Sequence, residues 1–181
     1  MQEEHLLVEQ AKQDPAHFRP LYDKYYERIF LYVFQRVEDK ETAFDITSQV
    51  FLKAMQSLHK YEFKGVPFAS WLYRIAKSEV YTLFRQQQVK RVVNMETGSL
   101  KDMMDEIEED QYDPYLEILK ESITELDEQD IQLIEMRFFE KRAFKEIAEI
   151  LDITENNAKV KTYRVLERLK KILIEKKRKS A

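Results

Sequence analysis

Amide and basic side chains gather in the C-terminal segment 155–173, at spacings that a helix would bring to one face. The exposed positions of such a helix carry Asn156, Asn157, Lys159, Lys161, Tyr163 and Arg164. Amides and cationic groups near a helix N-terminus suit hydrogen bonds to base edges and phosphates in a DNA major groove. The chemistry predicted for this segment is therefore recognition of a nucleic-acid duplex.

A second helix must support the first, and the preceding residues supply it. Residues 144–151 carry an apolar stripe and are joined to 155–173 by Asp152-Ile153-Thr154, the arrangement of a helix-turn-helix. Ala148 permits a close approach of the two helices, and the Thr154 hydroxyl can cap the second. The residues expected to seal the pair are Ile147, Leu151, Ile153 and Val165. The alternative is a helical hairpin whose solvated face is basic.

Aromatic and basic side chains also share one face of the segment 68–87. Apolar residues occupy one side of this helix, while the other side holds Arg74, Lys77, Ser78, Tyr81 and Arg85. Rings such as Trp71, Tyr73 and Tyr81 can stack on unpaired bases, each stack being worth about 1–3 kcal/mol. Phosphate contacts are expected from Arg74, Lys77 and Arg85. The segment predicts a platform for single-stranded nucleic acid, with a solvated face bearing stray aromatic residues as the alternative.

Helical periodicity extends over most of the chain. Apolar residues recur at three- and four-residue steps in the segments 18–33, 40–58, 115–126 and 131–138. With only two Gly and four Pro, the composition is typical of an all-α protein. Within 40–58, the residues away from the apolar stripe look like ordinary surface; they are Asp45, Ser48, Gln49, Leu52, Lys53 and Gln56.

Charge divides the chain into parts. The net charge is −4, yet residues 155–181 hold ten Lys or Arg against three Glu, and residues 96–113 hold eight acids against one Lys. The acidic stretch loses the helical periodicity and is interpreted as a flexible linker. We therefore expect two small helical domains, residues 1–93 and 115–181, joined by an acidic linker at 94–114.

Several classes of function are not expected. Cysteine is absent and His5, His17 and His59 are scattered, so no catalytic group, metal site or cofactor is predicted. The N-terminus carries Glu3 and Glu4 where a signal peptide would be positive, and no apolar run approaches the roughly 18 residues of a bilayer span. A cytoplasmic protein is expected.

Two blocks of sequence together resemble the extracytoplasmic-function (ECF) sigma factors of the sigma-70 family. The first block contains FRPLYDKYYERIFLYV, TAFDITSQVFLKAMQSLHKY and FASWLYRIAKSEVYTLFR, within residues 18–87. The second, residues 123–173, contains FKEIAEILDITENNAKVKTYRVLERL. The resemblance implies a protein that binds core RNA polymerase, recognises promoter DNA and drives promoter opening, without being an enzyme.

The resemblance also implies roles for individual residues. Contacts to the polymerase are implied for Asp45, Ser48, Gln49, Phe51 and Leu52. Contacts to the downstream promoter element and its melted strand, including a base flipped from the duplex, are implied for Phe63, Lys64, Gly65, Trp71, Arg74, Lys77, Ser78, Tyr81 and Arg85. Contacts to the upstream element are implied for Thr154, Asn156, Asn157, Lys159, Lys161, Arg164 and Arg168. The acidic linker would thread toward the active-site cleft, and an anti-sigma protein is a further candidate partner.

Some positions depart from the family pattern. Ser78 stands where many relatives have Asn, which puts the downstream specificity in question, and Ala143 stands where a capping Ser or Thr is usual. Asp152 occupies the usual Gly position of the turn, which Asp tolerates if the backbone there is left-handed. The contrasting hypothesis is an autonomous, dimeric helix-turn-helix regulator that binds a palindrome without polymerase.

Overall fold

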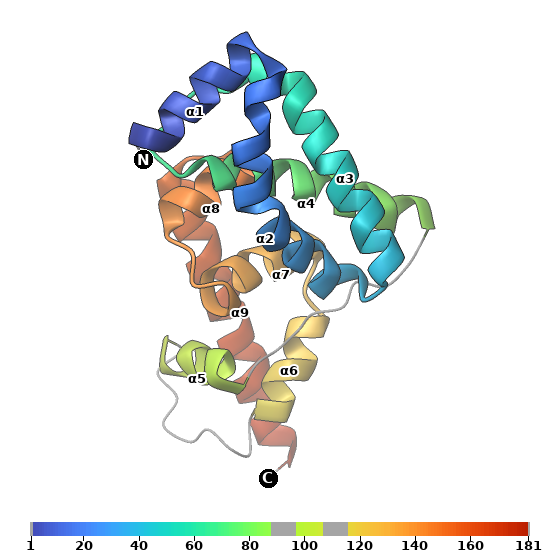
Figure 1. Cartoon of the computed structure of the whole chain (residues 1–181). Coiled ribbons are helices and arrows are strands. Elements are labelled where there is room, and N and C mark those ends of the chain that lie inside the picture. Colours follow the sequence, from blue (N-terminus) through green and yellow to red (C-terminus); the bar gives the residue numbers. More distant parts are fainter. Residues whose placement is uncertain (1, 88–96, 107–115, 181) are drawn as a thin grey trace. The chain divides into compact units, whose positions relative to one another are not determined.

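The computed structural model describes residues 2–87, 97–106 and 116–180, and every regular element within these ranges is a helix (Figure 1). The chain divides into two compact units. The first holds residues 1–92 and 149–151, and the second holds 93–148 and 152–181. Within the described part, no helix is both long and apolar enough to cross a membrane. The predicted all-α class with two domains is therefore confirmed.

The first unit consists of four α-helices and two short 3₁₀ helices among its described residues. Asp39 caps one helix by accepting the Thr42 N–H at 2.7 Å, and Glu38, at a φ of 55°, ends the helix before it. Pro15 and Pro20 lie in first turns, where a missing N–H costs nothing. The elements are α1 (Gln2–Gln13), η1 (Pro15–Phe18), α2 (Arg19–Val37), α3 (Lys40–Ser57), η2 (Leu58–Lys60) and α4 (Phe68–Gln87).

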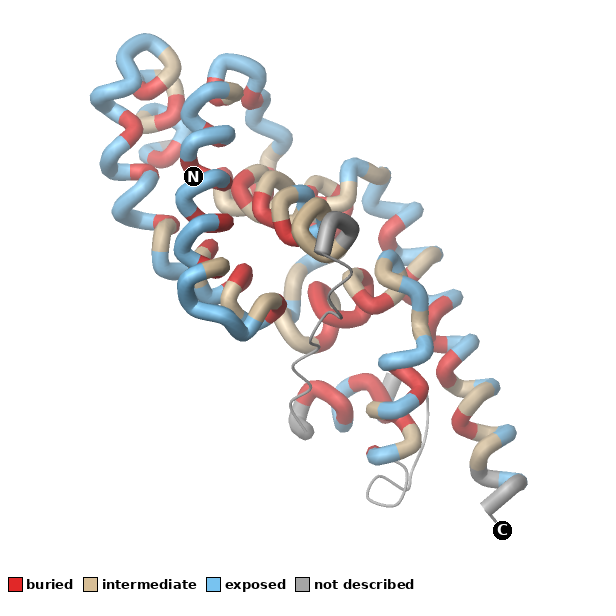
Figure 2. The backbone as a smooth tube through the Cα atoms, turned by 90° about the vertical axis from the view of Figure 1, so that its right-hand side faces the viewer, coloured by how far each residue is buried: buried red, intermediate tan, exposed pale blue. Residues whose placement is uncertain are grey.

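The core of the first unit lies between α2, α3 and α4. Small residues at the contacts let the helix backbones approach closely, and large residues fill the remaining space. Ala43, Ala54 and Ala76 are fully buried beside Leu21 and the other core residues. Figure 2 shows buried positions recurring along one side of each helix, with exposed positions on the other. This packing holds the outer faces of α3 and α4 in fixed orientations.

The second unit carries the helix-turn-helix. Its long C-terminal helix buries Ala158, Val165 and Leu169 against the shorter helices. Residues Glu135–Phe139 form a π-helical turn, a wider coil than the α-helix that the periodicity of 131–138 predicts. The elements are α5 (Thr97–Glu106), α6 (Leu116–Thr124), α7 (Glu128–Ile134), η4 (Glu135–Phe139), α8 (Phe144–Leu151) and α9 (Glu155–Ser180).

Two helices differ from the sequence-based expectation. The helix α5 lies inside the stretch expected to lack helical periodicity, and its Leu100, Met103 and Met104 are completely buried against α6 and η4. The spacing of these three residues is helical, but the surrounding acidic residues dominate the composition and conceal the stripe. The helix α1 was not predicted either, because only Val8 and Ala11 of its apolar residues are buried and Glu4 joins them in the interior.

Candidate nucleic-acid interface and docking surface

The predicted helix-turn-helix is formed by α8, the turn 152–154 and α9. Asp152 adopts a φ of 57°, which is the left-handed conformation expected for a residue in the Gly position. The Thr154 hydroxyl accepts the Asn157 N–H at 3.2 Å, so the predicted cap of α9 is present. Ile147 and Val165 are buried, whereas Leu151 and Ile153 are only half-buried. The turn therefore fixes where the first residues of α9 point.

The outer face of α9 carries most of the residues expected to contact duplex DNA. Exposed side chains are Asn156, Asn157, Lys159 and Arg164, and Lys161 is half-buried. Val160 and Tyr163 are also exposed on this helix, at 37% and 47%, and Val160 was not predicted as a site residue. An exposed valine on a base-reading helix can contact a thymine methyl group. Its position could have been predicted from the sequence, because Val160 lies four residues from both Asn156 and Arg164 and so shares their face of the helix.

Arg168, another predicted DNA contact, forms an ion pair with a residue of a different helix. It pairs with Asp130 of α7 at 2.7 Å, and the Asp130 side chain is only 13% exposed. Burial raises the pKa of Asp130, and the charge of Arg168 opposes that shift. The ion pair fastens α9 to α7, and because the Arg168 side chain is 50% exposed, Arg168 stays a predicted DNA contact as well.

The N-terminus of α8 has half of a capping box. The Glu146 carboxylate accepts the Ala143 N–H at 3.3 Å, but the alanine offers no side-chain acceptor in return. Replacing Ala143 with Ser should complete the box and raise the free energy of unfolding of the second unit by about 1 kcal/mol. Thermal unfolding of the full-length variant measures this gain. No increase, or a decrease, would show that the local backbone does not accept the cap.

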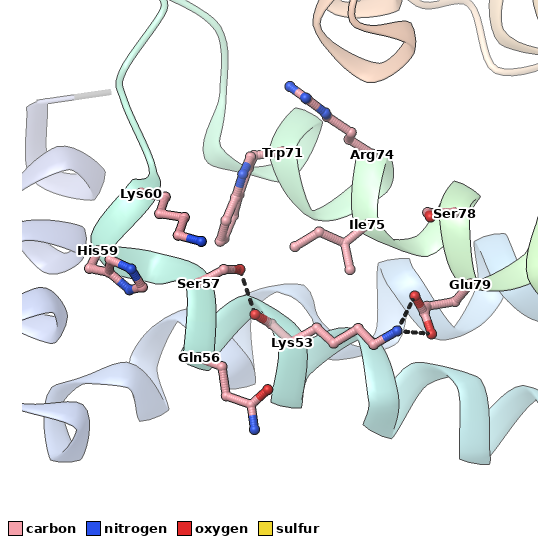
Figure 3. Close-up of a pocket in the computed structure, with 10 residues that line it drawn as sticks. All are labelled: Lys53, Gln56, Ser57, His59, Lys60, Trp71, Arg74, Ile75, Ser78 and Glu79. Atoms are coloured by element: carbon pink, nitrogen blue, oxygen red, sulfur yellow. Dashed lines mark hydrogen bonds and ion pairs between the residues drawn. The ribbon is translucent and has the colours of Figure 1, made fainter.

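On the first unit, an open pocket of about 700 Å³ lies between the end of α3 and the outer face of α4. Figure 3 shows Trp71 and Lys60 directed toward the same space, with Ile75 beside them. A ring, an apolar floor and several cations in one concave surface suit an unpaired base and its phosphates. The lining residues are Lys53, Gln56, Ser57, His59, Lys60, Trp71, Arg74, Ile75, Ser78 and Glu79.

The predicted single-strand residues on α4 fall into two groups. Trp71 is half-buried and packs edge-on against Tyr61, with ring centroids 5.3 Å apart, so its ring is held in place while it lines the pocket. Tyr73 instead packs against Tyr32 and belongs largely to the core. Ser78 and Tyr81 are exposed, whereas Arg74 and Lys77 are half-buried. Arg85 lies in α4, but its side chain is outside the described set.

The loop between η2 and α4 carries the remaining three predicted single-strand residues. Gly65 has a φ of 69°, a conformation that glycine adopts without strain. Phe63 is 44% exposed and its ring lies 5.6 Å from that of His5, while Lys64 is exposed. The turn at Gly65 brings the chain back to the start of α4, so this loop borders the same end of α4 as Trp71.

Glu79 occupies the apolar sector of α4 and is explained by an ion pair. Both of its carboxylate oxygens accept hydrogen bonds from Lys53 Nζ at 2.7 Å (Figure 3). The Glu79 side chain is only 15% exposed, so the pair is partly shielded from solvent. This contact joins α3 to α4 at one end of the pocket.

The expected docking face on α3 is exposed, with one exception. Asp45, Ser48, Gln49 and Leu52 all lie on the solvent side of the helix, and Leu52 is 46% exposed. Phe51 is buried at 4% exposure between α3 and α2, because position 51 faces the neighbouring helix. Phe51 therefore supports the surface from within and cannot itself contact a partner without unpacking.

A row of aromatic rings beside this face was not predicted as functional. Every fourth residue of one stripe of α2 is aromatic, and neighbouring rings lie 5.0–6.5 Å apart. Phe44 of α3 stacks on this row with a centroid distance of 4.6 Å to Phe30, and it is 40% exposed. We call Tyr22, Tyr26, Phe30, Phe34 and Phe44 the aromatic row. Together with Leu52 and Met55 it provides exposed apolar surface, and its four-residue spacing was visible in the sequence.

The chain matches two family models in sequence order. Residues 21–90 match Sigma-70 region 2, and residues 116–169 match Sigma-70, region 4. The first match contains the pocket and the docking face, and the second contains the helix-turn-helix.

Characterised relatives agree with these matches. The ECF RNA polymerase sigma factor BldN of Streptomyces coelicolor is 30% identical over 173 residues, which are 92% of this chain; this chain spans 64% of BldN. The RNA polymerase sigma factor SigV of Bacillus subtilis is 30% identical over 134 residues, covering 74% of this chain and 77% of SigV. The ECF RNA polymerase sigma factor SigX of the same organism is 27% identical over 160 residues, covering 85% of this chain and 82% of SigX.

A solved structure shares the fold. CnrH, determined in complex with the cytosolic domain of CnrY, superposes with a TM-score of 0.58 at 16% identity, covering 95% of this chain and 97% of CnrH. From the two family matches and these relatives, the chain belongs to the sigma-70 family of RNA polymerase sigma factors, in its ECF subfamily.

Proposed function

We propose that the chain is a dissociable initiation subunit of RNA polymerase whose three surfaces divide the work: docking on α3, capture of a melted strand on α4, and duplex reading on α9. The observation that carries this proposal is the separation of two nucleic-acid surfaces onto two compact units of one family chain. A protein built this way contacts two promoter elements at once. The contrasting hypothesis of an autonomous dimeric regulator is not favoured by the family.

Docking on the polymerase is assigned to the exposed face of α3 and the adjacent aromatic row. Exposed apolar side chains such as Leu52 and Met55 lie beside Asp45, Ser48 and Gln49. An apolar centre with a polar border is the usual composition of a protein interface. An anti-sigma protein that covered the same surface would compete directly with polymerase.

Capture of the melted strand is assigned to the pocket between α3 and α4. Opening a duplex costs unstacking and unpairing energy, which a base stacked on an aromatic ring partly offsets. Trp71 offers such a ring, and Lys60 and Arg74 line the same pocket as phosphate partners. Ser78 can donate or accept a hydrogen bond with the base but provides fewer groups than the Asn of many relatives.

Duplex reading is assigned to the outer face of α9, with Asn156, Asn157, Lys159, Lys161 and Arg164 as the contacting residues. The amides suit adenine edges, and Arg164 suits guanine or phosphate. None of these steps makes or breaks a covalent bond, in keeping with a family of initiation factors rather than enzymes. The site of action is the cytoplasm, where polymerase and chromosome are found.

The strand-capture role is tested by Trp71→Ala. The variant should bind a forked promoter, whose downstream element is single-stranded, about 10-fold more weakly in the polymerase holoenzyme, because one base loses its stacking partner. Binding of a fully duplex fragment carrying only the upstream element should not change. His17→Ala is the control in the same unit: it removes an exposed ring of η1 that belongs to none of the proposed surfaces, and it should bind the forked DNA as the wild type does. Equal affinity of wild type and Trp71→Ala for the forked DNA would remove the pocket from the strand-binding site.

A further inference from the structure

The N-terminal helix α1 lies outside the region matched by the Sigma-70 region 2 model, which begins at residue 21. It nevertheless belongs to the first unit, where Val8 and Ala11 are buried in the shared core. One of its acidic residues, Glu4, is buried as well, at 8% exposure. A buried carboxylate is costly unless it is well paired, so its partners indicate what α1 contributes.

The Glu4 carboxylate joins three separate parts of the chain. Its Oε2 accepts the backbone N–H of Phe68, the first residue of α4, at 2.9 Å. Its Oε1 accepts Lys24 Nζ at 2.9 Å and also the hydroxyl of Tyr25. A single side chain of α1 thus caps α4 and is held from the other side by α2.

The electrostatics of this contact favour the ionised carboxylate. Burial alone would raise the pKa of Glu4, but the hydrogen bonds from Phe68, Tyr25 and Lys24 outweigh burial and lower it. Burial, together with the hydrogen bond to Glu4, raises the pKa of Tyr25, so its hydroxyl remains a donor. A negative charge at the N-terminus of the twenty-residue helix α4 is also favoured by the helix dipole.

Other residues of α1 contact the loop that leads into α4. The ring of His5 lies 5.6 Å from that of Phe63, and Lys12 Nζ lies 5.8 Å from the centre of the Tyr61 ring. Tyr61 in turn packs edge-on against both Phe68 and Trp71, at centroid distances of 5.1 and 5.3 Å. The helix α1 therefore contacts the loop at both ends and, through Tyr61 and Phe68, supports the ring that lines the pocket.

We propose that α1 is part of the strand-capture site, and that Glu4 is a positioning residue that sets the start of α4 and hence the placement of Trp71. This inference rests on the proposed function of the pocket and adds a residue that contacts no DNA itself. A glutamine at position 4 keeps only one acceptor oxygen. It therefore cannot accept the Phe68 N–H on one side while it also accepts hydrogen bonds from Tyr25 and Lys24 on the other. The first turn of α4 would then lose its cap or its anchor.

The test compares polymerase holoenzymes carrying wild type, Glu4→Gln and the control Glu3→Gln. Glu3 is exposed in the same helix turn, so the control makes the same charge change without the buried contacts. Glu4→Gln should bind forked promoter DNA about 10-fold more weakly, with unchanged affinity for core polymerase and for an upstream-element duplex. Trp71 is the single tryptophan, so its emission in the free protein should shift to longer wavelength in Glu4→Gln alone.

A second variant guards against loss of folding. Lys24→Met removes one hydrogen-bond partner of Glu4, and the Lys24 side chain is 49% exposed. The variant should also weaken forked-DNA binding, by about 2- to 3-fold. Forked-DNA affinity and Trp71 emission equal to wild type in Glu4→Gln would overturn the inference. Equal losses of core, duplex and forked-DNA binding would also overturn it, since they indicate a general folding role. Failure of the wild-type holoenzyme to bind forked DNA would instead overturn the proposed function.

Discussion

Replacing Arg164 with glutamate is expected to weaken binding of the upstream promoter element by about 100-fold at low salt. The change removes a cation from the exposed face of α9 and places a carboxylate against the phosphates or base edges. Transcription from promoters that depend on this element should fall in proportion, while the complex with core polymerase remains intact. Titration of a duplex fragment with the holoenzyme, at several salt concentrations, measures the loss and the change in salt dependence.

Arg19→Glu is the matched control for this prediction. Arg19 lies at the start of α2 in the first unit, and its side chain is 85% exposed, so the variant carries the same change in net charge. It should bind the upstream element as the wild type does. If Arg164→Glu transcribed a cognate promoter at the wild-type level, α9 would not be the reading helix.

Replacing Leu52 with glutamate is expected to weaken binding to core polymerase by about 30-fold or more. Leu52 is 46% exposed on the outer face of α3, in the proposed interface. A buried charge at the centre of an apolar interface is not compensated, and single central residues often carry 2 kcal/mol or more of binding energy. Competition against a labelled wild-type chain for core polymerase measures the change in affinity.

Leu31→Glu provides the comparison for Leu52→Glu. Leu31 is exposed to nearly the same extent, at 47%, but it lies on α2 and is not one of the residues of the aromatic row. It should bind polymerase normally, since it makes the same substitution outside the proposed interface. Wild-type affinity in Leu52→Glu, or equal losses in both variants, would exclude α3 as the docking helix.

The sequence predicts the helices that have strong apolar periodicity and clear end signals. The segment 68–87 is a helix over that whole range, and Thr154 caps α9 as expected. The missed helix α1 depends on contacts that periodicity does not record, because Glu4, one of its buried residues, is charged. The spacing of Leu100, Met103 and Met104 in the missed helix α5 is helical, but the acidic composition of this stretch favoured a linker.

Individual site residues were harder to assign than helices. Periodicity separates the inner face of a helix from its outer face. This was enough to predict that Asp45, Leu52 and Arg164 are exposed. It does not separate a residue facing a neighbouring helix from one facing solvent, so it did not reveal that Phe51 is buried. Ion pairs between distant residues, such as Arg168 with Asp130, appear only when the helices are packed.

The central claim is that this chain recognises promoters as a subunit of RNA polymerase. In vitro transcription with purified core polymerase across a promoter library tests it most directly. The chain is expected to associate with core polymerase and to direct initiation at a defined set of promoters that the core alone does not use. If the chain left the core inactive on every promoter, yet bound a symmetric DNA site tightly as a dimer, it would be an autonomous regulator and not a polymerase subunit.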